Sequence, residues 1–304
     1  MNPDLSVRIC KVKFSNPVLV ASGTFGYSEE YGSIFDLNKL GGIITKSITL
    51  NPREGHPPPR TCETPSGMLN AIGLANVGVE RFIKEKLPFL RTLKTKVIVN
   101  VAGSSIEEYV EVVKRLECKK GIDLLEINIS CPNVKEGGIA FGSSPESAYR
   151  CIKTVKENTS FPIIAKLSPN VSDIVKIALA AKEAGADAVS LINTLVGMAI
   201  DLETKKPKLT NITGGLSGPA IKPVALAMVW KVAQQVKIPI IGIGGIMNYQ
   251  DALEFILAGA CMIQIGTGNF VDPECSVKIV EGLRKYCEEN KIKKIEGLVG
   301  KLKT

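Results

Sequence analysis

Short apolar runs recur along the whole chain and are separated by longer stretches of mixed polarity. The runs are rich in valine and isoleucine and show little polar–apolar alternation, which is typical of parallel strands covered on both faces. The pattern therefore predicts eight buried strands. They are PVLVASG (17–23), GGIITKS (41–47), KVIVNVAG (96–103), LLEINISC (124–131), PIIAKLS (162–168), AVSLINT (188–194), PIIGIGG (239–245) and MIQIGTG (262–268).

Amphipathic stretches lie between several of these runs. Residues 105–119 place apolar side chains at three- and four-residue spacing, which predicts a helix. A second helix is predicted to begin with Ser144 as its N-cap and Pro145 at its first position. A third, over 172–186, is predicted to end at Gly185, a residue suited to a helix C-terminus.

Strands alternating with helices place the chain in the α/β class and predict a (β/α)8 TIM barrel. The length of 304 residues suits one such domain, which typically needs about 250 residues, so residues 1–304 are expected to form a single domain. An open, doubly wound sheet is the alternative. Against it, no G-x-G-x-x-G turn follows the first strand.

Three segments fall outside the repeating pattern. SVRICKVKF (6–14) alternates in polarity and predicts an N-terminal hairpin that closes the barrel floor. Two long connections, 48–95 and 195–218, predict loop insertions at the carboxyl face of the barrel. The first contains NPREGHPPPR, which is too rich in proline for a helix and is expected to be a mobile loop. The second is expected to form a hairpin or loop insertion.

Composition narrows the class of protein. No apolar run approaches the ~20 residues of a membrane span, and the N-terminus lacks the apolar core of a secretory signal, so a soluble cytoplasmic protein is expected. The eight cysteines form no C-x-x-C pair and there is one histidine, so no metal site is predicted on this chain. The net charge of +8 is dispersed, which favours solvated helix faces over a nucleic-acid surface.

Polar residues gather near the carboxyl ends of the predicted strands, where barrels of this kind place their chemistry. Lysines and amides inside apolar strands are unfavourable unless they contact a ligand or each other. A single buried asparagine could equally be a satisfied core residue, but the whole set predicts a polar cavity. The set comprises Ser22, Lys46, Ser47, Asn100, Asn128, Cys131, Lys166, Asn193 and Thr194.

The charge of this cavity suggests an anionic ligand. Glu126 is expected to point to the opposite face from Asn128, which would leave the cavity cationic and lined by amides. Glycine-rich ends after the last two strands predict a phosphate site. Lys46 and Lys166 could serve as phosphate ligands, Schiff-base nucleophiles or charge partners of an electron-poor ring. Flavin mononucleotide (FMN) would use all of these features.

The motifs together resemble those of the dihydroorotate dehydrogenases, flavin enzymes of pyrimidine synthesis. The resemblance covers essentially the whole chain, with every motif in the same order and spacing. It rests on VASGTFGYSEEY, ITKSIT, GMLNAIGLANVG, INISCPNVKEGG, AKLSPN, LINT, GGLSGPAIKP, GIGGI and IQIGTG.

The resemblance implies roles for individual residues. Cys131 matches the catalytic base, which removes the C5 proton of dihydroorotate while hydride leaves C6 for the flavin. The positions that match substrate contacts are Lys46, Asn70, Ala71, Ile72, Gly73, Leu74, Asn128, Asn193 and Thr194. Those that match FMN contacts are Ser22, Lys46, Ser47, Asn100, Asn128, Lys166, Ile192, Gly218, Gly244, Gly245, Gly266 and Thr267.

The thiol at position 131 and the segment CPNVKEGGIAFG resemble the soluble class 1, B-type catalytic subunits. That resemblance implies a homodimer within a heterotetramer, in which an iron–sulfur flavoprotein passes electrons to NAD. This chain carries no dinucleotide fingerprint and no cysteine cluster, so the partner subunit must hold the FAD and the 2Fe-2S cluster. A fumarate-using homodimer is the alternative within the family.

Three rival functions remain open at this stage. A flavin-dependent tRNA reductase would fit the basic charge, although the low aromatic content of 5% and the absence of an appended RNA-binding domain speak against it. A non-catalytic flavin-binding subunit would not need an intact cavity. An enzyme acting on a different pyrimidine, such as uracil, would not need a lysine for a substrate carboxylate.

Overall fold

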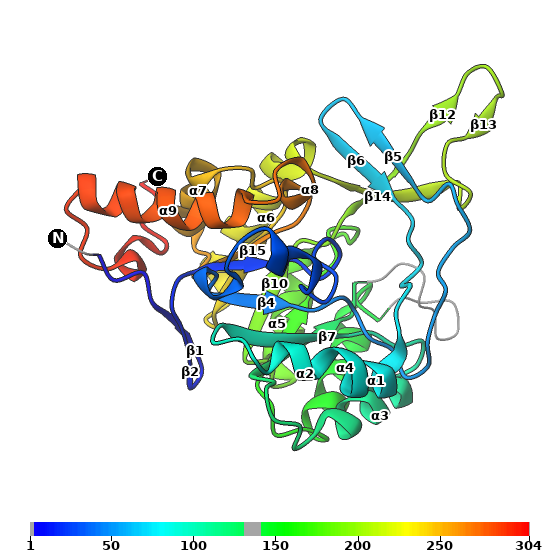
Figure 1. The fold of residues 1–304 in the computed structure, drawn as a ribbon, viewed down its shortest axis with the longest axis horizontal. Helices are drawn as coiled ribbons and strands as arrows, with labels where there is room; N and C mark the ends of the chain where they lie inside the picture. Colours follow the sequence, from blue (N-terminus) through cyan, green and yellow to red (C-terminus); the bar gives the residue numbers. More distant parts are fainter. Residues whose placement is uncertain (1–2, 131–140, 304) are drawn as a thin grey trace.

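A closed barrel of parallel strands forms the centre of the molecule (Figure 1). The computed structural model describes residues 3–130 and 141–303. The strands follow one another around the barrel in the order β3-β4-β7-β8-β9-β10-β15-β16, and β16 pairs with β3 to close it. Their bounds are β3 Val18–Val20, β4 Gly42–Ile44, β7 Lys96–Val101, β8 Leu124–Asn128, β9 Ile163–Lys166, β10 Ala188–Leu191, β15 Ile240–Ile243 and β16 Met262–Ile265.

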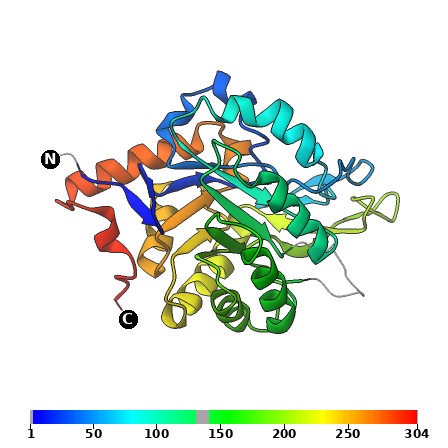
Figure 2. The ribbon, with the colours of Figure 1, turned by 90° about the horizontal axis from the view of Figure 1, so that it is seen from below.

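Helices surround the barrel on its outer side (Figure 2). The α-helices are α1 Gly78–Arg81, α2 Leu87–Leu90, α3 Ile106–Leu116, α4 Pro145–Lys156, α5 Ile174–Glu183, α6 Lys222–Gln235, α7 Tyr249–Ala258, α8 Gly268–Val271 and α9 Cys275–Glu289. A π-helical turn (Phe82–Lys86) joins α1 to α2, and short 3₁₀ turns occur at Glu30–Ser33, Leu37–Lys39, Pro219–Ile221 and Ile295–Leu298. No helix among the described residues is both long and apolar enough to cross a bilayer.

The strand and helix predictions are confirmed, and the open-sheet alternative is excluded because the barrel closes. The eight strands lie inside the eight predicted runs. Ser144 caps α4 by accepting a hydrogen bond from the Ser147 amide, and Pro145 is its first residue. Gly185 follows α5 with φ of 96°, a left-handed conformation that glycine adopts without strain.

The N-terminal segment forms the predicted hairpin, in which β1 (Val7–Ile9) pairs with β2 (Val12–Phe14). The Phe14 side chain is fully buried and lies against Gly42, the first residue of β4. Parallel strands begin at the same end of the barrel, so this contact places the hairpin at the amino end, opposite the predicted cavity.

The two long connections meet in a four-stranded antiparallel sheet with the order β11-β14-β6-β5. The connection 195–218 supplies β11 (Leu195–Met198), β14 (Thr213–Ser217) and the small β12–β13 hairpin (Ile200–Asp201 with Lys206–Pro207), as predicted. The connection 48–95 supplies β5 (Thr61–Thr64) and β6 (Gly67–Asn70) as well as α1 and α2. The segment NPREGHPPPR (51–60) contains no helix or strand, whereas residues 67–70 are ordered as β6 by pairing with β14.

Candidate active site

A cavity of about 440 Å³ opens at the carboxyl ends of the barrel strands, beneath the antiparallel sheet. Residues that follow β3, β4, β10, β15 and β16 form its floor, and residues of the two insertions form its walls. The cavity is lined by the following predicted site residues: Ser22, Lys46, Ser47, Asn70, Ala71, Ile72, Gly73, Leu74, Asn128, Lys166, Ile192, Asn193, Thr194, Gly218, Gly244, Gly245, Gly266 and Thr267.

Two predicted site residues do not belong to this lining set. Cys131 lies outside the described residues, so its role stays a prediction from the sequence. Asn100 lies one layer deeper in the barrel: its side chain is fully buried and donates a hydrogen bond to Glu126 Oε1 at 2.7 Å.

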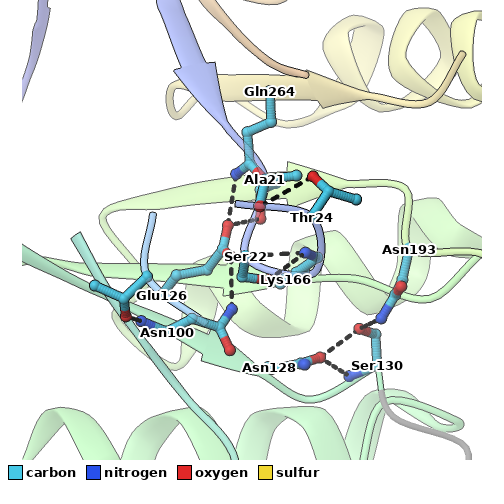
Figure 3. A network of polar contacts seen from close by, with 12 residues as sticks. Ala21, Ser22, Thr24, Asn100, Glu126, Asn128, Ser130, Lys166, Asn193 and Gln264 are labelled. Atoms are coloured by element: carbon cyan, nitrogen blue, oxygen red, sulfur yellow. Dashed lines mark hydrogen bonds and ion pairs between the residues drawn. The ribbon is translucent and has the colours of Figure 1, made fainter. Parts of the chain in front are cut away.

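The prediction that Glu126 points away from Asn128 is wrong. Side chains two residues apart on a strand share a face, so Glu126 also points into the barrel. Its carboxylate is fully buried and lies 3.7 Å from the Lys166 ammonium, which lines the cavity (Figure 3). The layer beneath the cavity therefore contains a carboxylate.

Lys46 follows β4 and is held by its backbone N–H, which donates to the Gly26 carbonyl at 2.8 Å. Burial lowers the pKa of the Lys46 ammonium below its ordinary value, and the nearby positive charge of Arg60 lowers it further. A bound anion would offset both effects. The cavity thus holds two half-buried or buried lysines, at different strand ends, that favour a negatively charged ligand.

A chain of hydrogen bonds fixes the amides beside the end of β8. Asn193 Nδ2 donates to Ser130 Oγ at 2.6 Å, and Ser130 Oγ donates to Asn128 Oδ1 at 2.6 Å (Figure 3). The hydroxyl of Tyr109, a buried residue of α3, donates to the Asn128 carbonyl at 2.7 Å. The backbone up to Ser130 is therefore anchored from three sides, and two amide side chains are oriented at the cavity wall.

The proline-rich insertion braces the wall formed by residues 70–74. The Ala71 N–H donates to the Arg60 carbonyl at 2.8 Å, and the His56 N–H donates to the Ile72 carbonyl at 3.1 Å. The imidazole Nδ1 of His56 lies 3.0 Å from the Ala71 carbonyl. These bonds join residues 56–60 to residues 71–72, so the insertion fixes the backbone that faces the cavity.

Glycines leave open space on the side of the cavity formed by β3, β15 and β16. A Cβ on Gly23 would have no atom of a non-neighbouring residue within 4 Å, and one on Gly266 would approach nothing closer than 3.8 Å. Gly244 and Gly245 have φ of 131° and 71°, which side-chain-bearing residues rarely adopt. Backbone groups can therefore approach a ligand closely here, as phosphate cradles require.

Gly215→Ala is expected to disturb the site without adding charge. Gly215 lies in β14 against Thr194, and a Cβ there would collide with the Thr194 side chain. Since small displacements of positioning groups can reduce rates about 10²-fold, we expect kcat/KM for the substrate to fall roughly ten- to hundredfold. Steady-state kinetics test this, with Gly297→Ala as the control, since a Cβ on Gly297 meets open space. Equal kinetics for both variants would contradict a role of Thr194 in positioning the ligand of this cavity.

The sequence reading missed the buried polar layer around Glu126. Ser190 on β10 and Gln264 on β16 are fully buried and both donate to Glu126 Oε2, at 2.8 and 2.6 Å. The available signal was the presence of polar residues within apolar strands, combined with the two-residue period of side-chain direction.

Comparison with known proteins agrees with this architecture. The family described as "Dihydroorotate dehydrogenase" matches residues 4–287 of the chain. A protein of Geotalea uraniireducens named "Dihydroorotate dehydrogenase B (NAD(+)), catalytic subunit" is 58% identical over 302 residues, 99% of each chain. Proteins with the same name are 57% identical in Geobacter metallireducens and 55% identical in Geobacter sulfurreducens, each over 300 residues, which are 99% of this chain and 98% of the relative. This chain therefore belongs to the dihydroorotate dehydrogenase family.

Proposed function

We propose that this chain oxidises dihydroorotate to orotate in pyrimidine synthesis, with FMN in the barrel cavity and NAD as the final electron acceptor. The observation that carries the proposal is the convergence, in one cavity, of two lysines, ordered amides and a glycine-lined wall. Family membership and the names of the relatives support the same reaction.

The residues present fit FMN. The open space in front of Gly23 and Gly266, next to Gly244 and Gly245, suits a phosphate that backbone N–H groups can reach. Lys166 and Ser22 lie at the cavity floor, where a cation would stabilise negative charge on a reduced ring. Ser47, Asn128, Ile192, Gly218 and Thr267 complete the proposed flavin contacts, and Asn100 would act from the layer beneath.

The substrate would occupy the rest of the cavity, between the floor and the segment 70–74. Lys46 binds the substrate carboxylate, and Asn70, Asn128 and Asn193 orient the ring, because its carbonyl and N–H groups match planar amides. Thr194 fixes the position of Asn193, whose Oδ1 accepts from the Thr194 N–H at 2.8 Å. These contacts hold the scissile C–H bonds in a fixed orientation.

Cys131 acts as the base in this proposal. Its thiolate takes the proton from C5, and the electron pair left behind forms the C5=C6 double bond of orotate as hydride departs from C6. Bound FMN supplies the hydride acceptor. An unperturbed cysteine has a pKa of about 8.5, so the thiolate fraction, and with it the rate, should rise with pH.

We further propose that electrons leave through a second subunit. The relatives are named catalytic subunits of an NAD(+)-linked enzyme, which supports a partner. That partner would be an iron–sulfur flavoprotein carrying FAD and a 2Fe-2S cluster, assembled with a homodimer of this chain into a heterotetramer.

As the pH rises, orotate affinity should begin to fall at a lower pH than it would if Lys46 had the ordinary pKa of a lysine. Only the charged amine attracts the carboxylate, and the pKa of Lys46 is lowered in the free protein, so binding above that pKa requires proton uptake. Titration of orotate against pH tests this, with Lys46→Arg as the reference. Arginine stays charged over the whole pH range of the titration. Any ionisation of orotate itself affects both proteins equally, so it does not contribute to the difference between their profiles. Identical pH profiles would contradict the role of Lys46.

The proposal as a whole is tested by native co-purification followed by acceptor assays. We expect an affinity-tagged chain to retain FMN and to bring down a partner with FAD and iron–sulfur absorbance. The complex should oxidise dihydroorotate with NAD, and the isolated chain should not. Rapid turnover of the isolated chain with fumarate would instead support the fumarate-using class, and no dihydroorotate oxidation with any acceptor would reject the proposal.

A further inference from the structure

We propose that Glu126 is a positioning residue that holds the Lys166 amine at the cavity floor and offsets its charge, thereby setting the reduction potential of the bound flavin. This inference rests on the proposed FMN site. It assigns a function to a buried group outside the cavity lining.

Glu126 is the centre of a polar layer built by five barrel strands. Its Oε1 accepts a hydrogen bond from Asn100 on β7 at 2.7 Å and lies 3.7 Å from Lys166 Nζ on β9. Its Oε2 accepts from Ser190 on β10 and from Gln264 on β16, at 2.8 and 2.6 Å. Figure 3 shows the carboxylate between Asn100, Gln264 and Lys166.

The hydrogen-bond donors of this layer converge on the Glu126 carboxyl group. The hydroxyl of Ser190 and the two amide N–H groups all donate toward Glu126, and Lys166 is a cation. A carboxylate is the acceptor that satisfies such a set, whereas an isolated buried charge would be strongly unfavourable. Glu126, Asn100, Ser190 and Gln264 have no exposed surface, so solvent does not screen the ion pair.

Lys166 connects this layer to the cavity. Its side chain is only 7% exposed, and Nζ lies 3.3 Å from Ser22 Oγ on the cavity side as well as 3.7 Å from the carboxylate beneath. Both Lys166 and Ser22 line the cavity, but Glu126 does not belong to that lining set. The amine is therefore held between the Glu126 carboxylate and the cavity.

This arrangement determines how strongly the cavity favours a reduced flavin. A flavin gains negative charge on reduction, so a lysine at the floor favours the reduced form. The negative charge of Glu126, directly behind that lysine, disfavours the reduced flavin. This repulsion remains large because the site is poorly solvated. Removing only the carboxylate charge should therefore leave an uncompensated cation and make the flavin easier to reduce.

The test measures the midpoint potential of bound FMN by anaerobic titration against a reference dye. Glu126→Gln preserves the shape and removes the charge. We expect it to raise the preference for reduced over oxidised FMN roughly ten- to hundredfold, which is a rise of about 30 to 60 mV for a two-electron couple. A potential within about 10 mV of the wild type, equivalent to about twofold, would overturn the inference.

The matched control is Ser190→Ala, which removes one hydrogen bond to the same carboxylate without changing the charge. We expect its melting temperature to fall. Its midpoint potential should stay within about 10 mV of the wild type, which corresponds to about a twofold change in the preference for reduced over oxidised FMN. If Ser190→Ala shifted the potential as much as Glu126→Gln, the effect would come from disrupted packing and the charge argument would fail.

A second comparison covers the case in which Glu126→Gln does not fold or hold FMN. In a Lys166→Gln background the carboxylate lacks its cation, so adding Glu126→Gln should again raise the midpoint potential. The double variant then carries neither charge of the Glu126–Lys166 pair. No difference between Lys166→Gln and the double variant would overturn the inference. If the wild-type chain itself binds no FMN, the proposed function fails; if it binds FMN and the potentials do not respond, only the role of Glu126 fails.

Discussion

Replacing Cys131 with alanine should lower the turnover of dihydroorotate about 10²- to 10⁴-fold and leave FMN bound. Loss of a positioned general base typically has an effect of this size. The residue follows Ser130 in the sequence, and the Ser130 hydroxyl is hydrogen-bonded to Asn128 and Asn193, two residues that line the cavity. Steady-state kinetics with the natural acceptor, together with the flavin spectrum, measure both parts of the expectation.

The pH profile separates a chemical role of Cys131 from a packing role. Turnover of the wild type should rise with pH toward the ionisation of the thiol, and Cys131→Ser should regain activity only at higher pH, because a hydroxyl is a much weaker acid. Cys118→Ala serves as the control, since Cys118 is an exposed thiol, and it should keep full turnover. Normal turnover of Cys131→Ala would remove the residue from the mechanism.

Lys46→Gln should lower kcat/KM for dihydroorotate about 10²-fold. The variant would lose the charged hydrogen bond that Lys46 is proposed to donate to the substrate carboxylate, and such bonds contribute roughly 1.5–3 kcal/mol. Burial lowers the pKa of Lys46 in the free protein, and a bound carboxylate would favour its charged form. The measurement is a comparison of steady-state kinetics with those of Lys285→Gln, a lysine on α9 whose side chain is 76% exposed. That control should behave like the wild type.

A substrate without the carboxylate makes the Lys46 prediction specific. Dihydrouracil has the same ring as dihydroorotate but lacks the group that Lys46 is proposed to bind. The wild type should strongly prefer dihydroorotate, and Lys46→Gln should lose most of that preference. If the variant were impaired equally with both substrates, Lys46 would act on the flavin or on the fold rather than on the carboxylate, and an acid substrate would no longer be supported by the site.

Most of the barrel could be predicted from local sequence patterns. Buried parallel strands such as 96–101 and 240–243 appear as continuous apolar runs, and helix caps such as Ser144 act within a few residues. Once a barrel is expected, the carboxyl end of each strand identifies the polar residues that must meet. This is why Lys46, Lys166 and Asn193, which lie far apart in sequence, could be assigned to one cavity that the structure then brings together.

Two features depended on information that no local window contains. The strands of the insertion at 61–70 are ordered by β14, and the Asn70 side chain bonds to Gly215, 145 residues away. The two-residue period places Glu126 on the inward face of β8, but its partners lie on four other strands. Propensity cannot reveal such contacts, since they arise only when the barrel closes.

The most direct test of the account is anaerobic addition of dihydroorotate to the purified chain, without partner or acceptor. If the cavity at the carboxyl face holds FMN beside the substrate, the yellow flavin absorbance should bleach and orotate should form in amounts equal to the flavin reduced. A chain that purifies with FMN but is not bleached by dihydroorotate, or a chain that takes up no flavin at all, would contradict the account.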